Sequence, residues 1–520
     1  MARLRLVIVH YHFRPGGIRR VIELATPHLR RALGADTVAL ATGEPADALW
    51  DERFRTANPG CAVAWVVEPA FRYLSEQSDA SARILADVRR ACERLLAGAD
   101  ETVVWAHNLG IGRNVILARE LTRACERRGV PLVSHHHDWW FENRWQRWPE
   151  MRRTGLPSLR AAAAVVFAAN RRIRHVAINN ADARVLRRRL GPRAAWLPNL
   201  SDRPIPPQRA AVQAAQDWLA RTLGERAPVW LLPCRLLRRK NVAEALLLGR
   251  WLRPEALLVT TGGVSSADEA AYGERLCQAS REHGWRLRLS VLAGDERAKP
   301  SVPELLAASE CVLLSSILEG FGLPYIEAAA AGRPLVARRL PNIAPDLARF
   351  GFRFPQSYAD VRVATALFDW RAERRRQQQF FRAWKAELPA SCRRLAGEPL
   401  LLARDSAPVA APFSRLTLTA QLEVLRWPAE ESWAACAALN PFLRAWRERA
   451  ANRRLQPSAW PESAEAWLEG EAYGRRFVEL LAHRPRHEPN RRAAAEIQQD
   501  FLRAKLGSEH QFPLLWRSDT

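Results

Sequence analysis

Residues 312–327 read VLLSSILEGFGLPYIE, and this stretch decides the fold class. Its first four residues are apolar or small, as in a buried strand, and the residues from Pro324 onward favour the start of a helix. Gly320 and Gly322 lie in the turn between them, where glycine allows the backbone to approach a ligand closely. A buried strand, a glycine-containing turn and a helix are the repeating unit of α/β proteins with a parallel sheet.

Strand and helix patterns alternate in the same way on both sides of this stretch. In the second half of the chain, strands are expected at 229–232, 257–260, 287–292, 312–315 and 335–337. In the first half, they are expected at 6–9, 38–41, 63–67, 103–105, 130–133, 165–167 and 176–178, with helices that begin near residues 18 and 114. Unbroken apolar strands are typical of sheets covered on both faces. The pattern therefore predicts two doubly wound α/β domains.

The same pattern divides the chain into three parts. A proline-rich segment at 201–207 is typical of a linker, so we expect one Rossmann-like domain at 1–205 and a second at 225–356. After residue 356 the strand signal fades. Amphipathic segments at 358–388, 416–426 and 464–481 predict a mainly helical extension over 357–520. The pairs Trp427-Pro428 and Trp460-Pro461 and the run 407–413 are expected to separate its helices.

The composition is that of a globular protein with a basic surface. The 520 residues include 79 Lys+Arg against 55 Asp+Glu, a formal net charge of +24, and 48% are hydrophobic. The basic residues are spread along the whole chain, and only four of them are lysines, so we expect no nucleic-acid partner. Such a surface still suits anionic substrates and acidic lipid headgroups.

The cysteines and the apolar runs indicate a cytoplasmic location. The eight cysteines are spread singly without a C-x-x-C pair, which argues against a zinc ribbon or a dithiol redox motif and favours reduced core residues. The apolar run at 6–9 is too short for the core of a signal peptide, and no stretch approaches the roughly 18 apolar residues of a membrane span. A peripheral membrane contact remains compatible with the charge.

Charged side chains follow two strands of the second predicted domain. Glu319 lies in the glycine turn, and Glu327 is expected in the first turn of the helix. Arg235 and Lys240 follow the strand at 229–232, so their cations are expected at the same edge of the sheet. An anion held there would meet the backbone N–H groups of Gly320, Phe321, Gly322 and Leu323. The structural alternatives are a solvated basic turn and glutamates that are solvated or only complement the helix dipole.

The first predicted domain carries its own polar residues at strand ends. Gly16 and Gly17 follow the first strand, although a plain tight turn would use the same residues. His107 and Asn108 follow the strand at 103–105, and the run 134–140, SHHHDWW, follows the strand at 130–133. Strand alternation places His135 and His137 on one side and His136 on the other. This argues against a three-histidine metal site within the run.

The chain carries Arg235 and Lys240, followed by the motif Glu319-Gly-Phe-Gly-Leu-Pro-x-x-Glu327. With this combination, the sequence resembles the retaining GT-B glycosyltransferases of family 4 over roughly residues 5–350. The resemblance implies a GT-B fold of two Rossmann-like domains. It also implies that a sugar is transferred with retention of configuration from a nucleotide-diphosphate sugar to an acceptor hydroxyl. No metal or other cofactor is expected, and the chain contains no D-x-D, the acidic pair by which metal-dependent sugar transferases hold their cation.

The resemblance also implies residue roles. Glu319 would contact sugar hydroxyls and Glu327 the ribose hydroxyls, while Arg235 and Lys240 would stabilise the departing diphosphate. Gly16 and Gly17 would face the donor phosphates. His137 would lie near the transferring sugar, unless it is a structural histidine. The acceptor side is assigned to His107, Asn108 and Asp138.

The expected partners are a nucleotide-sugar donor and a sugar, glycan or lipid-linked acceptor. Two other functions stay open. The chain could be a non-catalytic basic protein that binds nucleic acid or an anionic membrane on the same scaffold, or a nucleotide-sugar epimerase. The sequence does not identify the base or the sugar of the donor, the acceptor, or the role of the helical extension.

Overall fold

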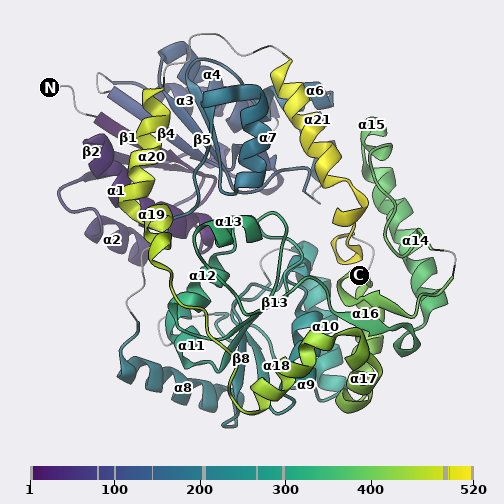
Figure 1. Cartoon of the computed structure of the whole chain (residues 1–520). Coiled ribbons are helices and arrows are strands. Elements are labelled where there is room, and N and C mark those ends of the chain that lie inside the picture. The colour runs from purple at the N-terminus through teal and green to yellow at the C-terminus, as the bar shows by residue number, and fades with distance from the viewer. Residues whose placement is uncertain are drawn as a thin grey trace. The chain divides into compact units, whose positions relative to one another are not determined.

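The fold is described from a computed structural model of the chain (Figure 1). The structure describes residues 4–516, apart from 79–80, 99–100, 143–144, 202–205, 265–266, 295–298, 405, 484–489 and 491. Two compact units are present. The first comprises Met1–Asp202 and Ser463–Lys505, and the second comprises Arg203–Glu462 and Leu506–Thr520. Most of the linker expected at 201–207 lies outside the described residues.

The first unit is built on a seven-stranded parallel sheet with the order β3-β2-β1-β4-β5-β6-β7. Its strands are β1 (Leu4–Val9), β2 (Ala35–Thr42), β3 (Ala62–Val67), β4 (Glu101–His107), β5 (Leu132–His136), β6 (Ile173–Ala177) and β7 (Ala194–Trp196). Its helices are α1 (Gly17–Leu33), α2 (Ala48–Thr56), α3 (Ser81–Leu95), α4 (Val115–Arg128), α5 (Arg147–Arg153), α6 (Leu159–Val166), α7 (Asn180–Leu190), α19 (Glu465–Leu468), α20 (Gly470–Ala482) and α21 (Ala493–Lys505). The strand order reverses between β1 and β4, as in a doubly wound fold.

The second unit has a six-stranded parallel sheet with the order β10-β9-β8-β11-β12-β13, which reverses between β8 and β11. Its strands are β8 (Val229–Leu232), β9 (Leu257–Thr260), β10 (Leu287–Arg288), β11 (Cys311–Leu314), β12 (Leu335–Arg338) and β13 (Gln356–Tyr358). Its helices are α8 (Arg209–Leu223), α9 (Val242–Leu252), α10 (Ala270–Glu282), α11 (Val302–Ala308), α12 (Leu323–Ala330), α13 (Ala344–Arg349), α14 (Trp370–Glu387), α15 (Ala390–Arg393), α16 (Leu418–Arg426), α17 (Ala429–Cys436) and α18 (Pro441–Ala451). Both sheets confirm the expected doubly wound class.

Two of the expected strands are wrong. The segment 165–167 is not a strand, because the alanine run before it favours the helix α6, whose first turn is capped by Ser158. The strand expected at 287–292 ends at Arg288, since Ser290 has a φ of 61° and turns the chain. The run 407–413 separates α15 from α16, as expected, and it contains β15 (Ala410–Pro412), which pairs antiparallel with β14 (Arg362–Ala364).

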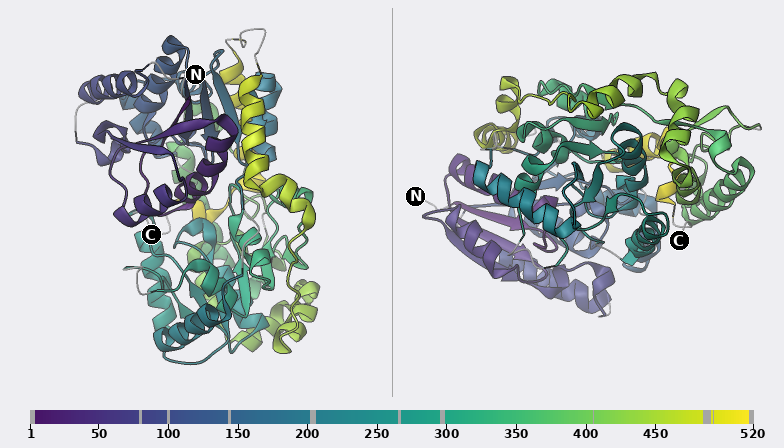
Figure 2. Two further views of the ribbon diagram at one scale, coloured as in Figure 1. Left: turned by 90° about the vertical axis from the view of Figure 1, so that its left-hand side faces the viewer. Right: turned by 90° about the horizontal axis from the view of Figure 1, so that it is seen from below.

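The segment expected to form one helical extension, 357–520, is divided between the two units. Helix α20 lies against α1 of the first unit (Figures 1 and 2), and its Tyr473 and Phe477 are buried in that unit's core. Gly474 permits this close approach, because a Cβ atom there would lie 2.9 Å from the Cβ of Ala32. Segment 463–505 therefore completes the core of the first unit.

No helix among the described residues is long and apolar enough to cross a membrane. The eight cysteines are all unpaired thiols, and six of them are buried. Burial accounts for these six as small core side chains.

Candidate active site

The second unit brings Lys240 and Glu319 together at the point where its strand order reverses. Lys240 follows β8, Glu319 follows the adjacent strand β11, and the Lys240 Nζ donates a hydrogen bond to the Glu319 Oε1. The two side chains are almost completely buried, at 9% and 10% exposure. The carboxyl ends of strands at such a reversal are where α/β folds bind ligands.

Arg239 is a second cation on the same carboxylate. Its Nη1 donates to the Glu319 Oε2 at 2.8 Å and to the carbonyl oxygen of Leu318 at 2.9 Å. The sequence analysis did not single out Arg239, although it lies within the basic run 235–240. Two cations around one carboxylate leave a net positive charge, which suits an anionic ligand.

The ionisation of Glu319 follows from these neighbours. Burial by itself would raise the pKa of its carboxyl, but the charges of Lys240 and Arg239 act in the opposite direction, together with a hydrogen bond from Ser316. The resulting pKa is about 2. Glu319 is therefore a carboxylate at every physiological pH and can accept hydrogen bonds from hydroxyl groups.

Backbone contacts hold the basic turn and the Glu319 loop together. The Ser315 hydroxyl donates to the carbonyl oxygen of Lys240 at 2.9 Å, and the Ile317 N–H donates to that of Arg239 at 2.8 Å. The Asn342 side chain donates to the carbonyl oxygen of Glu319 at 2.6 Å. This part of the site is therefore ordered by the fold of the second unit alone.

The glycine turn requires Gly322. Its φ is +87°, and a Cβ there would lie 2.7 Å from the Ile343 Cδ1 and 3.0 Å from the Tyr325 ring. Helix α12 begins at Leu323, directly after this residue, and no side chain caps it. The first N–H groups of a helix lack partners within the helix, so they suit an anion such as a phosphate.

Helix α12 begins one residue earlier than expected. Pro324 is its second residue rather than its first, and Glu327 is its fifth residue, in the second turn instead of the first. Phe321 is buried, whereas Glu327 is half-buried. Arg235 is exposed and lies beside the backbone after β9, because a Cβ on Gly262 would be 2.9 Å from its Cγ.

In the first unit, Gly16 and Gly17 form the start of α1. Gly16 occupies the cap position, Gly17 is the first helical residue, and no side chain caps the helix. A Cβ on Gly17 would meet no atom within 4 Å. The first turn of this helix thus leaves room beside its N–H groups.

Asn108 ties the end of β4 to the residues after β5. Its φ is +57°, and its Oδ1 accepts hydrogen bonds from the backbone N–H groups of His137 at 2.8 Å and Asp138 at 3.1 Å. The Tyr11 hydroxyl donates to the Asn108 carbonyl oxygen at 3.0 Å. The structure thus brings together Asn108, His137 and Asp138, with Asn108 fixing the backbone of the other two.

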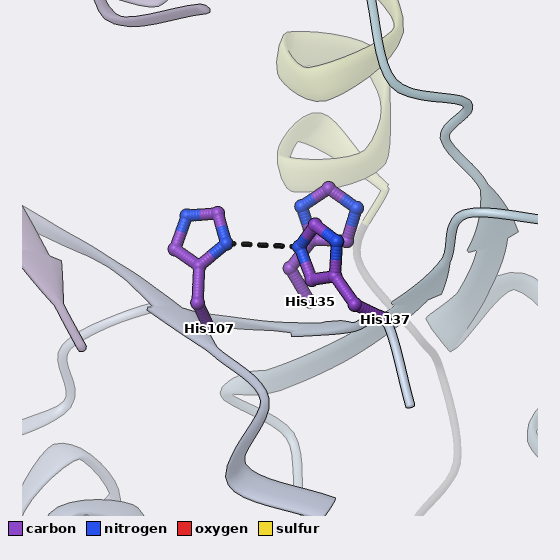
Figure 3. Close-up of side chains that lie close together, drawn as sticks. All are labelled: His107, His135 and His137. Carbon is purple, nitrogen blue, oxygen red and sulfur yellow. Dashed lines mark hydrogen bonds between the residues drawn. The ribbon is translucent and has the colours of Figure 1, made fainter. Parts of the chain in front are cut away.

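The histidines lie on the sides of the sheet that alternation predicts. His135 and His137 lie on the same side as His107, and the three rings are neighbours (Figure 3). His136 lies elsewhere, with its Nε2 2.9 Å from the Nδ1 of His175. Burial lowers the pKa of His107 and His135 far below the usual value and that of His137 to about 4, so all three are neutral at pH 7.

His107, His135 and His137 each offer a ring nitrogen, and these nitrogens lie within 4.8 Å of one another. The sequence pattern indicated only the run 135–137 as a three-histidine set. The set of His107, His135 and His137 was not predicted, because His107 comes from a different strand and lies 28 residues before His135 in the chain. The signal that could have revealed this set is the pairing of β4 with β5, whose ends place His107 beside His135.

Comparisons with known proteins agree with this fold. Residues 221–353 match the family described as Glycosyl transferases group 1. The chain is 25% identical over 348 residues to mannosylglucosyl-3-phosphoglycerate synthase of Petrotoga mobilis, covering 65% of each chain. It is 22% identical over 278 residues to mannosylglucosylglycerate synthase of the same organism, covering 49% of this chain and 63% of that one. The alignments thus span less than two thirds of the length of these curated relatives.

A solved structure, HepE of Anabaena in complex with UDP-glucose, has a TM-score of 0.51 at 14% identity and covers 92% of this chain and 99% of that chain. At this identity the likeness concerns the fold alone. It supports the two Rossmann-like units described above as a GT-B fold.

Proposed function

The chain is a GT-B protein of the glycosyl transferases group 1 family, and on that premise we propose that it moves a sugar from a nucleotide-diphosphate sugar to an acceptor hydroxyl. The observation that carries the proposal is the buried Glu319 carboxylate held by Lys240 and Arg239 beside the open start of α12. It lies within the residues that match the family.

The second unit is proposed to hold the donor. Its diphosphate would be neutralised by Lys240, Arg239 and Arg235, and would accept hydrogen bonds from the N–H groups of residues 320–323. Glu319 would then accept hydrogen bonds from sugar hydroxyls and Glu327 from those of the ribose. The HepE structure contains UDP-glucose, which supports a nucleotide-sugar donor for a chain of this fold.

The reaction we propose is metal-independent and retains the configuration of the sugar. The bond between the anomeric carbon and the diphosphate oxygen breaks, and a bond to the acceptor oxygen forms on the same face of the sugar. The acceptor proton passes to the departing phosphate. Lys240 and Arg239 stabilise the charge that develops on this leaving group, so catalysis depends on positioning and electrostatics.

The first-unit assignments also remain proposals. His137 would contact the transferring sugar through its Nδ1, because its Nε2 shares a 3.1 Å hydrogen bond with the Nδ1 of His107. Asn108 would position His137 through its bonds to the backbone. Gly16 and Gly17 would bind donor phosphate, and His107 and Asp138 would belong to the acceptor side.

The test is the release of nucleoside diphosphate from UDP-, GDP- and ADP-sugars, with and without acceptor, in the presence of EDTA. The names of the relatives suggest glucosylated 3-phosphoglycerate and glucosylated glycerate as the first acceptors to test. We expect acceptor-dependent release that Lys240→Ala and Arg239→Ala each lower about 100-fold, a loss of the size seen for removal of one transition-state contact. The matched control is Arg353→Ala, an exposed arginine of the same unit.

Each outcome of this assay decides between the candidate functions. Unchanged turnover in Lys240→Ala contradicts the proposed donor site. Interconversion of nucleotide sugars without acceptor indicates an epimerase. Absence of turnover, combined with steeply salt-dependent binding to nucleic acid or anionic vesicles, indicates a binding protein.

A further inference from the structure

Three buried histidines of the first unit are arranged like the ligands of a metal ion. His107 is the last residue of β4, and it is paired in register with His135 of the adjacent strand β5. His137 follows two residues later on the same side. One ring nitrogen from each lies within 4.8 Å of the other two. We propose that His107, His135 and His137 bind one Zn²⁺ ion within the first unit.

The spacing of two of these nitrogens already matches a bound ion. Zinc binds imidazole nitrogen at about 2.0–2.1 Å with tetrahedral angles, which places two ligand nitrogens roughly 3.3 Å apart. The His107 Nδ1 and the His137 Nε2 are 3.1 Å apart (Figure 3). The third nitrogen, from His135, lies within 4.8 Å of both.

His135 has a buried nitrogen that an ion would satisfy. Its Nδ1 accepts a hydrogen bond from the Trp105 indole N–H at 3.3 Å, whereas its Nε2 makes no hydrogen bond of good geometry among the described residues, and the Leu197 backbone lies near the ring. The side chain is fully buried. A buried polar nitrogen without a partner is destabilising and calls for an explanation such as an ion.

The donor atoms favour a transition metal. Neutral imidazole is the form of histidine that binds a metal, and it predominates at pH 7 for an ordinary histidine. Imidazole nitrogen is a donor for zinc and its first-row neighbours, whereas calcium and magnesium prefer oxygen. Three histidines leave the fourth zinc position for water.

Binding through the His135 Nε2 requires the ring proton to move to Nδ1. The Tyr473 hydroxyl, 3.5 Å from this Nδ1, is placed to accept that proton in a hydrogen bond, while the long bond from Trp105 is given up. In metal sites, such partners hold a ligating histidine in the required tautomer. Tyr473 belongs to α20, so the returning C-terminal segment contributes to the site.

This inference does not rest on the proposed function. The ion would lie in the first unit, whereas the diphosphate is assigned to cations of the second unit. On His137 the ion would occupy Nε2 and keep the proton on Nδ1, where it can be donated to a hydroxyl.

The test uses the full chain, dialysed against a chelator and titrated with Zn²⁺ and with Co²⁺, whose visible absorption reports tetrahedral nitrogen ligation. We expect one ion per chain and a rise in melting temperature with Zn²⁺. His107→Asn and His135→Asn are expected to weaken binding at least 100-fold, and Tyr473→Phe about 10-fold, as for an outer partner of a ligand. His136→Asn is the matched control, because it places the same substitution one residue away on the opposite side of β5.

The proposal is overturned if the wild-type chain binds neither Zn²⁺ nor Co²⁺ at one equivalent. It is also overturned if Zn²⁺ binds without raising the melting temperature. Unchanged binding in both His107→Asn and His135→Asn does the same. If these two variants do not fold, the Tyr473→Phe measurement decides, and unchanged affinity there contradicts the site. Metal content and absorption are measured without any sugar transfer, so failure of this site is distinguishable from failure of the proposed function.

Discussion

Glu319 links the stability of the second unit to pH. Its pKa is about 2, below the ordinary 4.5, so the stability of the paired carboxylate is complete above about pH 5 and is lost as the pH falls toward 2. Relative to Glu319→Gln, we predict that the wild-type chain loses about 1 kcal/mol of this stability at pH 4 and about 2 kcal/mol at pH 3. Calorimetric melting from pH 6 to pH 3 measures the difference. Parallel melting curves for the two chains would refute it.

Gly322 is predicted to be the glycine on which the donor site depends. Gly322→Ala must adopt a positive φ and also displace Ile343 and Tyr325, so we expect a loss of about 2–3 kcal/mol and a shifted start of α12. Gly332 at the other end of α12 also has a positive φ but open space around it, so Gly332→Ala should cost only about 1 kcal/mol. Chemical denaturation and nucleotide binding of both variants test this. Equal effects on binding would contradict it.

At the residue scale, the sequence predicted part of the proposed donor site. Lys240 and Glu319 could be predicted to meet, because each follows a strand at the point where the strand order reverses. Arg239 could not be distinguished from its neighbours, since Arg238, Arg239 and Lys240 lie in a single turn and the sequence does not show which of their side chains point the same way. Arg238 bonds to Glu269, whereas Arg239 and Lys240 reach Glu319.

At the element scale, the contact between α20 and α1 is predicted to be intolerant of any side chain at Gly474. A Cβ there would lie 2.9 Å from Ala32 and 3.2 Å from the His28 carbonyl oxygen, neither of which can move without the backbone of α1. We expect Gly474→Ala to destabilise the first unit by about 1–3 kcal/mol. In α9, Gly249 has no atom within 4 Å of a new Cβ, so Gly249→Ala should be neutral or stabilise by up to about 1 kcal/mol. Equal unfolding free energies for the two variants would contradict this account of the contact.

Helix α21 is anchored by a buried cation at its end. The Lys505 Nζ lies 2.6 Å from Glu142 and 3.3 Å from Asp182, and Asp182 also accepts a hydrogen bond from the Trp139 indole at 2.8 Å. Lys505→Met leaves two buried carboxylates without their cation, so we predict a loss of about 3–5 kcal/mol in unfolding free energy. Lys385→Met removes a half-buried lysine from α14 and should cost less than about 1 kcal/mol. Similar losses in the two variants would show that Lys505 has no such role.

Elements with a clear apolar period could be predicted, and the exceptions have physical causes. Most parallel strands were found because they are unbroken apolar runs. The segment 165–167 looks the same locally, but the alanines before it extend a helix up to Val166. In α20, no local signal distinguishes packing against α1, more than 400 residues earlier, from packing in a separate helical domain.

At the scale of the whole molecule, the two sheets and the family were predictable, whereas the assignment of the C-terminal part was not. Apolar periodicity and the short motifs that contain Arg235, Lys240, Glu319 and Glu327 are visible in the sequence itself, so the two sheets and the resemblance could be predicted from them. Segment 463–505 belongs to the first unit through contacts such as Tyr473 with Trp105, which are distant in the chain. A prediction that divides the chain into continuous domains cannot assign segment 463–505 to the first unit, because the second unit lies between them in the sequence.

Calorimetric titration of the chain with UDP-glucose, GDP-mannose and ADP-glucose in EDTA is the most direct test of the donor site. We predict that at least one of them binds once per chain, that Lys240→Ala weakens this binding at least 30-fold through loss of a charged contact to the diphosphate, and that Arg353→Ala binds as the wild type does. Equal affinity in wild type and Lys240→Ala would contradict the account.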